Sequence, residues 1–213
     1  MLKSVFALVF VGLGFLPNAQ TYPPDKIKIY WKDSNGAPYM TFDRLRTEHP
    51  EVKFIMNTAV RSGMGSPVGL YIENGKQISS PIFILNSKVN VGIQPMGVFF
   101  ITTKGACIQE LKSKVSYKDA VWAIQSGPLL VMNGKVNPRL PKGKAIPRNG
   151  IGIKKDGQVY FACLKMGYRD FANHFLKEGC IDALYLEDGL PESYHRNVLH
   201  KRSAHYGPMI VVE

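Results

Sequence analysis

The sequence predicts an α+β fold: a single domain with a mixed, largely antiparallel sheet and few helices. Short apolar runs recur along the chain, and several are separated by dipeptides that favour tight hairpin turns, namely Asn74-Gly75, Asn133-Gly134 and Asp156-Gly157. Only residues 168–178 show the apolar periodicity of a helix of ordinary length. The chain contains no internal repeat, low-complexity tract or linker that would divide it into two domains.

Residues 1–19 are typical of a secretory signal peptide, and residues 20–213 are the domain that it would export. Lys3 supplies a positive start, residues 4–16 are weakly polar to apolar, and residues 17–19 offer a small residue at a cleavage position. The apolar stretch is short for a membrane span, and the alternative is an uncleaved N-terminal anchor. We therefore expect an exported protein, periplasmic or secreted, with no transmembrane segment after signal cleavage.

The N-terminal half of this domain contains strand-like runs and one short helix. We expect strands, in chain order, at residues 27–31, 52–56, 67–72, 76–79 and 97–102. Thr41 is a suitable N-cap for a helix that continues to about Glu48, because Pro50 prevents a longer one. The Asn74-Gly75 turn predicts that the strands on either side of it form a hairpin.

The C-terminal half contains the predicted helix of ordinary length. Its apolar side chains fall on one face, at Phe171, Ala172, Phe175 and Leu176. Gly179 then suits the left-handed conformation that ends many helices. Residues 181–186 follow at once as a strand, and residues 208–212 are the expected last strand.

Composition limits the classes of function. The chain is 45% hydrophobic and 20% charged, which excludes a mainly disordered protein. Its formal net charge of +11 favours anionic partners, such as phosphodiesters, acidic glycans or membrane headgroups, or it serves solubility alone. The lysines are scattered along the sequence without an aromatic-interleaved basic stripe, so we expect no nucleic-acid partner.

Cysteine and histidine spacing indicates neither a metal site nor a cofactor. Cys107, Cys163 and Cys180 permit one disulfide with one free thiol, or three buried thiols. Cys163 lies in an apolar run and is typical of an inert core thiol. No Cys/His spacing matches a zinc site, and the last three histidines follow one another at steps that fit no single helix or strand face.

Three segments in the second half of the chain join an apolar run to polar groups that are costly to bury. They are residues 125–131, 148–153 and 180–189. An amide, a guanidinium or a carboxylate that leaves water needs a partner or a function. We therefore expect these strand ends to meet at one polar site.

Taken together, the segments resemble the phosphodiester glycosidase family, with an uncovering-enzyme-like domain of the compact bacterial type. The resemblance is carried, in order, by residues 54–57, 66–75, 95–99, 123–128, 148–152 and 180–189. It implies an exported hydrolase, with no cofactor, that cleaves the bond between the anomeric carbon of a sugar and a phosphodiester oxygen. The expected partner is accordingly a glycosyl phosphodiester or an anionic glycan.

The resemblance implies three candidate catalytic residues, Arg148, Glu187 and Asp188. A guanidinium matches two phosphate oxygens, so Arg148 would contact the phosphate; its alternative role is an ion pair with Asp182 or Glu187. One carboxylate of the Glu187-Asp188 pair would act as a base or stabilise the oxocarbenium-like transition state. Adjacent strand residues point to opposite faces, so only one of the two can face the site directly. The alternative to a catalytic role is that Glu187, Asp188 and Gly189 form only a solvated turn at the strand end.

The implied substrate-binding residues are Asn57, Gln125, Ser126, Gly127 and Asn149. The polar side chains among them would orient sugar hydroxyls or the phosphate. Each is also suited to a turn or to the cap of a strand end.

Three departures separate this chain from the family pattern. Thr58-Ala59 replaces a glycine pair after Asn57, and Met96 stands where the family has asparagine. In the Leu-Asp-Gly motif, an ungapped reading puts Glu187 in the place of the aspartate, whereas a one-residue insertion makes Asp188 the aspartate. Side chains in place of glycine would hinder the approach of a ligand to the backbone, and a displaced carboxylate would disturb the reacting geometry. The alternative functions are therefore a catalytically degenerate family member that binds anionic glycans or phosphodiesters in the cell envelope, or a purely structural envelope protein.

Overall fold

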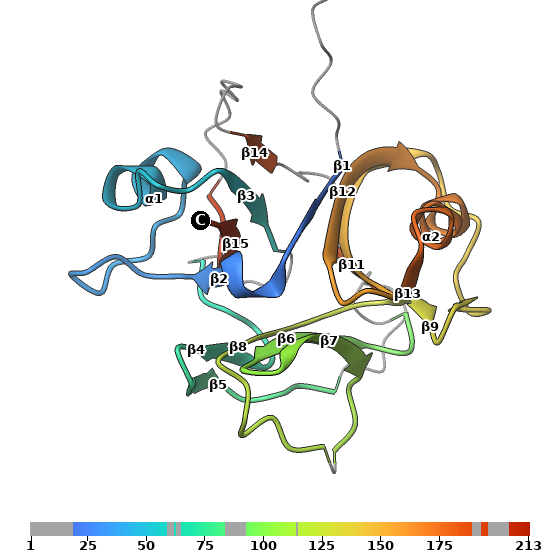
Figure 1. Ribbon diagram of the computed structural model, residues 1–213, viewed down its shortest axis with the longest axis horizontal. Coiled ribbons are helices and arrows are strands. Elements are labelled where there is room, and N and C mark those ends of the chain that lie inside the picture. The colour runs from blue at the N-terminus through green and yellow to red at the C-terminus, as the bar shows by residue number, and fades with distance from the viewer. Residues whose placement is uncertain are drawn as a thin grey trace, which may run out of the picture.

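A computed structural model describes residues 19–58, 62, 65–83, 93–113, 115–188, 193–195 and 205–213. In this part of the chain, three sheets surround a shared core and two α-helices lie outside them (Figure 1). The expected predominance of antiparallel strands with few helices is confirmed. The expectation of one mixed sheet is wrong, because every described strand pair is antiparallel and the strands divide among three sheets.

The largest sheet has six strands and carries helix α2 (Tyr168–Lys177) on one face (Figure 1). Its order is β1 (Ala19–Tyr22), β12 (Val159–Met166), β11 (Ile146–Lys154), β13 (Cys180–Asp188), β9 (Leu129–Met132) and β10 (Lys135–Val136). Strand β11 can pack closely against α2 because a Cβ atom added to Gly152 would lie 2.7 Å from the Phe175 ring. The predicted helix and its glycine end, Gly179 with φ of 85°, are confirmed.

The second sheet has four strands, with a 3-10 turn and a short helix beside it. Its order is β14 (Ser193–His195), β3 (Phe54–Asn57), β15 (Met209–Val212) and β2 (Ile27–Tyr30), with η1 (Pro24–Lys26) and α1 (Phe42–Glu48) adjoining β2 and β3 in sequence. Thr41 caps α1 as predicted, since its hydroxyl oxygen accepts a hydrogen bond of 3.2 Å from the backbone N–H of Arg44.

The third sheet has five strands. Its order is β5 (Lys76–Ser79), β4 (Tyr71–Glu73), β8 (Trp122–Ser126), β6 (Gly97–Thr102) and β7 (Gly105–Glu110). The Asn74-Gly75 turn joins β4 to β5 as predicted, and both residues have positive φ, at 49° and 76°. This is the backbone geometry that a two-residue hairpin turn requires.

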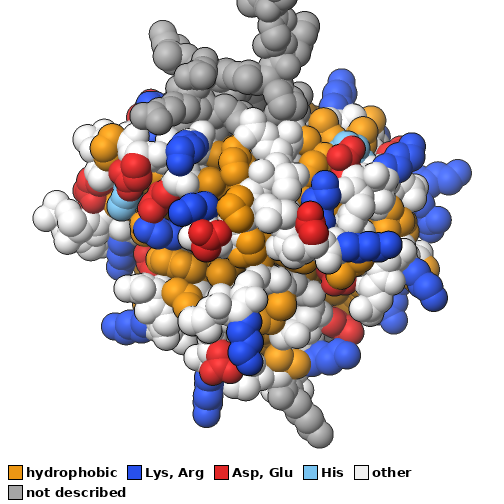
Figure 2. All heavy atoms as spheres, in the orientation of Figure 1, with side chains coloured by type: hydrophobic (Ala, Val, Ile, Leu, Met, Phe, Trp, Pro, Cys, Tyr) orange, Lys and Arg blue, Asp and Glu red, His pale blue; other side chains and the backbone are white. Residues whose placement is uncertain are grey.

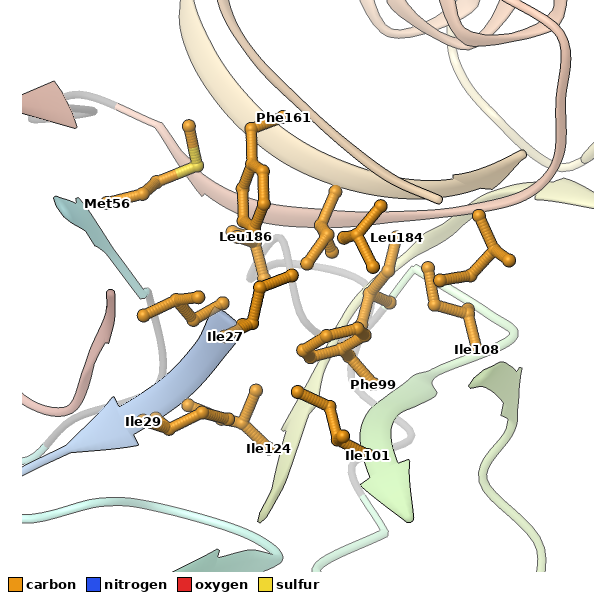
Figure 3. Packing of buried hydrophobic residues seen from close by; sticks show 14 of the residues in the cluster. Ile27, Ile29, Met56, Phe99, Ile101, Ile108, Ile124, Phe161, Leu184 and Leu186 are labelled. Carbon is orange, nitrogen blue, oxygen red and sulfur yellow. The ribbon is translucent and has the colours of Figure 1, made fainter. Parts of the chain in front are cut away.

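The shared core is formed by apolar side chains from all three sheets. Figure 3 shows Ile27 of β2, Phe99 of β6 and Leu184 and Phe161 of the six-stranded sheet directed toward one another. A second cluster fills the space between α2 and the other face of the six-stranded sheet. The six-stranded sheet is therefore buried on both faces along β11 and β13, so polar side chains on these strands must be accommodated within the protein.

No disulfide joins the three cysteines, and only Cys180 is fully buried, so both predicted alternatives, one disulfide with one free thiol and three buried thiols, are wrong. Cys107 is exposed, whereas Cys180 is buried beneath α2, and burial raises the pKa of the Cys180 thiol to about 12. The pKa of the Cys107 thiol is also raised, first by its partial burial and second by the charge of Asp182.

We expect iodoacetamide at mildly alkaline pH to alkylate Cys107 first, because access dominates when both pKa values are raised. Cys180 should react only after denaturation. Mass spectrometry of peptides from the native and the unfolded protein measures this order, and a Cys107→Ser variant is the control. Alkylation of Cys180 in the native protein at the rate of Cys107 would contradict the structure.

Among the described residues, no helix has the length and apolarity needed to cross a membrane. The predicted signal peptide lies outside the described residues except for Ala19, where β1 begins. Export therefore stays a prediction.

Candidate active site

Two buried asparagines join the end of β3 to the six-stranded sheet. The side-chain N–H of Asn149 donates to the Asn57 side-chain oxygen at 2.8 Å and to the Asn57 backbone oxygen at 3.0 Å. Their exposed fractions are only 0% for Asn149 and 1% for Asn57. These two predicted substrate-binding residues, 92 positions apart in the sequence, therefore meet in the fold.

Glu187 and Ser126 lie next to this pair. Glu187 of β13 is the cross-strand partner of Asn149, and the register shifts between Asn149 and Gly150. The Ser126 hydroxyl, at the end of β8, lies 3.5 Å from the backbone oxygen of Leu186. We call Asn57, Ser126, Asn149 and Glu187 the strand-end cluster. Asn57 and Ser126 end their strands and Glu187 is next to last in β13, whereas Asn149 lies within β11. Glu187 alone among the four is partly exposed.

Arg148 is buried on the opposite side of β11. Its guanidinium carbon lies 3.9 Å from the centre of the Tyr168 ring and 5.9 Å from that of Tyr185, and Nη2 donates to the Lys144 backbone oxygen at 3.3 Å. Because successive strand residues alternate in direction, Asn149 points toward β3 and Arg148 toward α2. A ligand that contacts both residues would have to lie across the end of the β11–β13 pair.

Asp188 is the cross-strand partner of Arg148, so two neighbouring cross-strand pairs contain all three candidate catalytic residues. The structure describes the backbone of Asp188 and not its side chain. Asp182, one proposed ion-pair partner of Arg148, instead lies opposite Ile153 and accepts a hydrogen bond of 2.9 Å from the Asn133 backbone. The proposed ion pair between Arg148 and Asp182 is therefore wrong.

The Gln125 side chain is bonded to the protein backbone. Its Oε1 accepts hydrogen bonds from the N–H groups of Leu70 at 2.9 Å and Ile82 at 3.1 Å, and its Nε2 donates to the Ile82 oxygen at 2.7 Å. Gln125 thus links Leu70, just before β4, to Ile82, which follows β5, through side-chain hydrogen bonds. Its geometry supports a positioning role and gives no support to direct substrate contact.

We expect Gln125→Ala to lower the free energy of unfolding by about 3 kcal/mol, because two backbone donors and one acceptor would lose their buried partner. Urea unfolding followed by circular dichroism measures this loss. Gln77→Ala, an exposed position on β5, is the matched control and should have almost no effect. Equal stability of the two variants would show that the Gln125 contacts are unimportant.

Met96 lies beside the Gln125 side chain, and Gly127 lies close to Met96. A Cβ atom added to Gly127 would lie 3.3 Å from the Met96 Cα, and the Met96 sulfur lies 3.8 Å from Gln125 Nε2. Met96 is buried, so this departure from the family pattern places an apolar side chain beside the Gln125 amide. The closeness of Gly127 to Met96 gives it a packing role, and substrate binding by Gly127 stays a prediction.

The departure at Thr58 is accommodated within the fold. Thr58 is buried, and its hydroxyl donates to the backbone oxygen of Pro208 at 2.7 Å, next to the start of β15. The side chain is thereby directed to the chain segment before β15. Ala59, Val60 and Gly189 of the predicted motifs lie outside the described residues.

One group of described residues has the spacing of metal ligands, but it lies away from the strand-end cluster. His49, Glu51 and Glu213 offer ligand atoms within 4.8 Å of one another. Glu213 already pairs with the Lys28 ammonium and accepts a 2.9 Å hydrogen bond from the Tyr30 hydroxyl. Asn57 pairs with Met209, the first residue of β15, whereas Glu213 follows the last residue of that strand. These contacts explain why His49, Glu51 and Glu213 lie close together: Glu213 belongs to a network of ion pairs and hydrogen bonds.

A surface hollow of about 590 Å³ also lies apart from the predicted residues. Its lining comes from the region of η1 and β2, the β6–β7 turn, and the β11–β12 turn, including Lys28, Lys104 and Asp156. None of the predicted site residues lines it. The strand-end cluster therefore remains the candidate active site.

Comparison with known proteins identifies the family to which this fold and these strands belong. The model of the phosphodiester glycosidase family matches residues 51–194, a range that contains the strand-end cluster, Arg148 and Asp188. The chain belongs to this family. It is 32% identical over 179 residues to the uncharacterized protein YigE of Escherichia coli strain K12, a match that covers 81% of this chain and 69% of YigE.

Solved structures share the fold at low sequence identity. The catalytic domain of zebrafish N-acetylglucosamine-1-phosphodiester α-N-acetylglucosaminidase, auto-inhibited by its pro-peptide, matches with a TM-score of 0.64 and 12% identity over 88% of this chain and 72% of that one. A Burkholderia pseudomallei protein matches with a TM-score of 0.60 and 9% identity over 91% and 73%. A Synechocystis protein matches with a TM-score of 0.57 and 12% identity. The match covers 92% of this chain but only 59% of the Synechocystis chain.

Proposed function

We propose that this protein is an exported hydrolase that cleaves sugar-1-phosphodiester bonds and releases a free sugar and a phosphomonoester. The observation that carries the proposal is the contact of Asn149 with Asn57 and its pairing with Glu187, with Ser126 beside the residue before Glu187, inside the range matched by the family. Export is proposed from the signal-like residues 1–19.

In the proposed reaction, water attacks the anomeric carbon while the bond from that carbon to the phosphodiester oxygen breaks. The oxygen leaves with the phosphate, which is a better leaving group than an alcohol and needs little protonation. Glu187 or Asp188 would accept the proton of the attacking water or stabilise positive charge on the sugar ring. Arg148 would stabilise the negative charge that develops on the departing phosphate.

The asparagine pair would position the sugar. Both hydrogen bonds from Asn149 hold its amide against Asn57, and its own side-chain oxygen has no hydrogen-bond partner among the described residues. A buried acceptor of this kind favours a donor from a ligand or a water molecule. A sugar hydroxyl supplies that donor.

The alternative is a family member that binds anionic glycans or phosphodiesters without cleaving them. The observation in its favour is that Arg148 and Asn149 point to opposite sides of β11. In a pure binder the guanidinium would serve as a buried anchor, and no carboxylate would act on the sugar.

A panel of UDP-sugars and aryl-phosphoryl sugars, incubated with the purified protein, tests the proposal. We expect release of the free sugar from at least one substrate, detected by chromatography. Calorimetry on the same panel identifies binding. Binding without release from any substrate would establish the alternative and contradict the hydrolase.

A further inference from the structure

We propose that a basic face beside the candidate active site docks a polyanionic glycan, a chain whose sugars are linked through repeated phosphodiesters. We define the basic face by Arg139, Lys142, Lys144 and Arg169. The inference deepens the proposed function, on which it rests, by specifying a polymeric substrate.

The fold gathers these cations although they are separated in the sequence. The backbone N–H of Tyr168, at the start of α2, donates to the Lys142 oxygen at 3.2 Å. The Arg169 guanidinium donates to the backbone oxygens of Leu140 at 2.9 Å and Pro138 at 3.3 Å. These hydrogen bonds hold residues 138–144 against the first turn of α2.

The chain continues from this segment into β11, whose third residue is Arg148. Figure 2 shows Lys and Arg side chains gathered on the side of the molecule where Figure 1 places α2.

The positive charge of the basic face is not neutralised within the described part of the chain. All four side chains belong to exposed residues, and none forms an ion pair with another described residue. Asp170 is the acidic residue of the first turn of α2. A group of uncompensated cations attracts a polyanion over several ångströms.

The basic face is continuous with Arg148, one of the three candidate catalytic residues. Arg148 Nη2 donates to the Lys144 oxygen, and a Cβ atom added to Gly143 would lie 3.0 Å from the Tyr168 ring and 3.5 Å from Arg148 Nη2. Gly143 has φ of 66°, so the segment that carries Lys142 and Lys144 takes a conformation that glycine permits. A chain seated on this face therefore lies next to Arg148, on the side of β11 opposite to Asn149.

The exposure of the cations favours a polymer over a single phosphate. One exposed contact between a lysine and a phosphate contributes little by itself. A chain with several phosphodiesters makes many such contacts at once, because each contact holds the next phosphate near the surface.

The test uses fluorescein-labelled poly(N-acetylglucosamine-1-phosphate) and the full chain at low ionic strength. The variant Arg139→Gln/Lys142→Gln/Lys144→Gln should bind this polymer about tenfold more weakly than the wild type, since three exposed contacts are lost. The control Lys53→Gln/Lys76→Gln/Lys104→Gln has the same net charge and should bind as the wild type does. Its exposed lysines come from the position before β3, from β5 and from the β6–β7 turn.

Three results would overturn the docking surface: equal weakening in both triple variants, equal binding of neutral dextran, or tighter binding of an oligothymidylate of the same charge, which would indicate a nucleic-acid interface. Both triple variants should keep the wild-type rate on a small aryl-phosphoryl sugar. If the wild type binds the polymer on this face but releases sugar from no substrate, the proposed function fails and the docking surface stands. If it cleaves the small substrate and the first triple variant keeps full polymer affinity, only the docking surface fails.

Discussion

Arg148→Ala is expected to lower the rate of sugar release about 100-fold or more, which is the scale of losing one charge-stabilising group. The same change removes a long buried side chain from the ring of Tyr168, and we expect it to lower the free energy of unfolding by about 2 kcal/mol. The two effects are separated by measuring sugar release per folded molecule together with urea unfolding.

Two further variants at Arg148 divide charge from packing. Arg148→Lys keeps the positive charge and loses the planar stack on Tyr168, whereas Arg148→Met keeps most of the apolar contact and loses the charge. If charge supports the reaction, the methionine variant should be as slow as the alanine variant and the lysine variant should be faster. A methionine variant with wild-type activity would assign Arg148 to structure alone.

Asn149→Ala is expected to reduce sugar release by a similar factor, about 100-fold, because the amide that orients the sugar would be absent. It should also lower the free energy of unfolding by about 2 kcal/mol, since two buried oxygens of Asn57 would lose their donor. Both quantities are measured by the substrate assay and by urea unfolding.

A double-mutant cycle with Asn57→Ala isolates the contact between the two side chains. The combined variant should be less destabilised than the sum of the single variants by about 1 kcal/mol, because the second change removes a side chain that the first has already left without its partner. Strict additivity in the urea experiment would mean that the 2.8 Å contact does not contribute to stability.

The local features of this fold could be predicted from the sequence because they depend on neighbouring residues. The Asn74-Gly75 and Asn133-Gly134 turns form as predicted, since asparagine and glycine accept the positive φ that such turns need. The helix after Gly167 has the predicted apolar face, which packs against the six-stranded sheet. The division of the strands into three sheets depends on contacts between distant segments, and no local pattern specifies it.

The candidate site was only partly predictable for the same reason. Asn57 and Asn149 meet where two separate sheets pack together, and Gln125 bonds to backbone groups that carry no sequence signal. The opposite directions of Arg148 and Asn149 follow from the alternation of strand residues, so this signal was present in the sequence. Tyr168, which stacks on Arg148, matched no motif and was identified only from the fold.

The most direct test of the candidate active site compares the wild type with Glu187→Gln/Asp188→Asn in the release of free sugar from an aryl-phosphoryl sugar. The substitutions keep the size of both side chains and remove the carboxylates that would act as a base or stabilise the sugar cation. The account predicts rapid release by the wild type and a loss of about 100-fold or more in the variant, with an unchanged unfolding midpoint. A variant that is as active as the wild type would contradict the assignment of the reaction to the ends of β11 and β13.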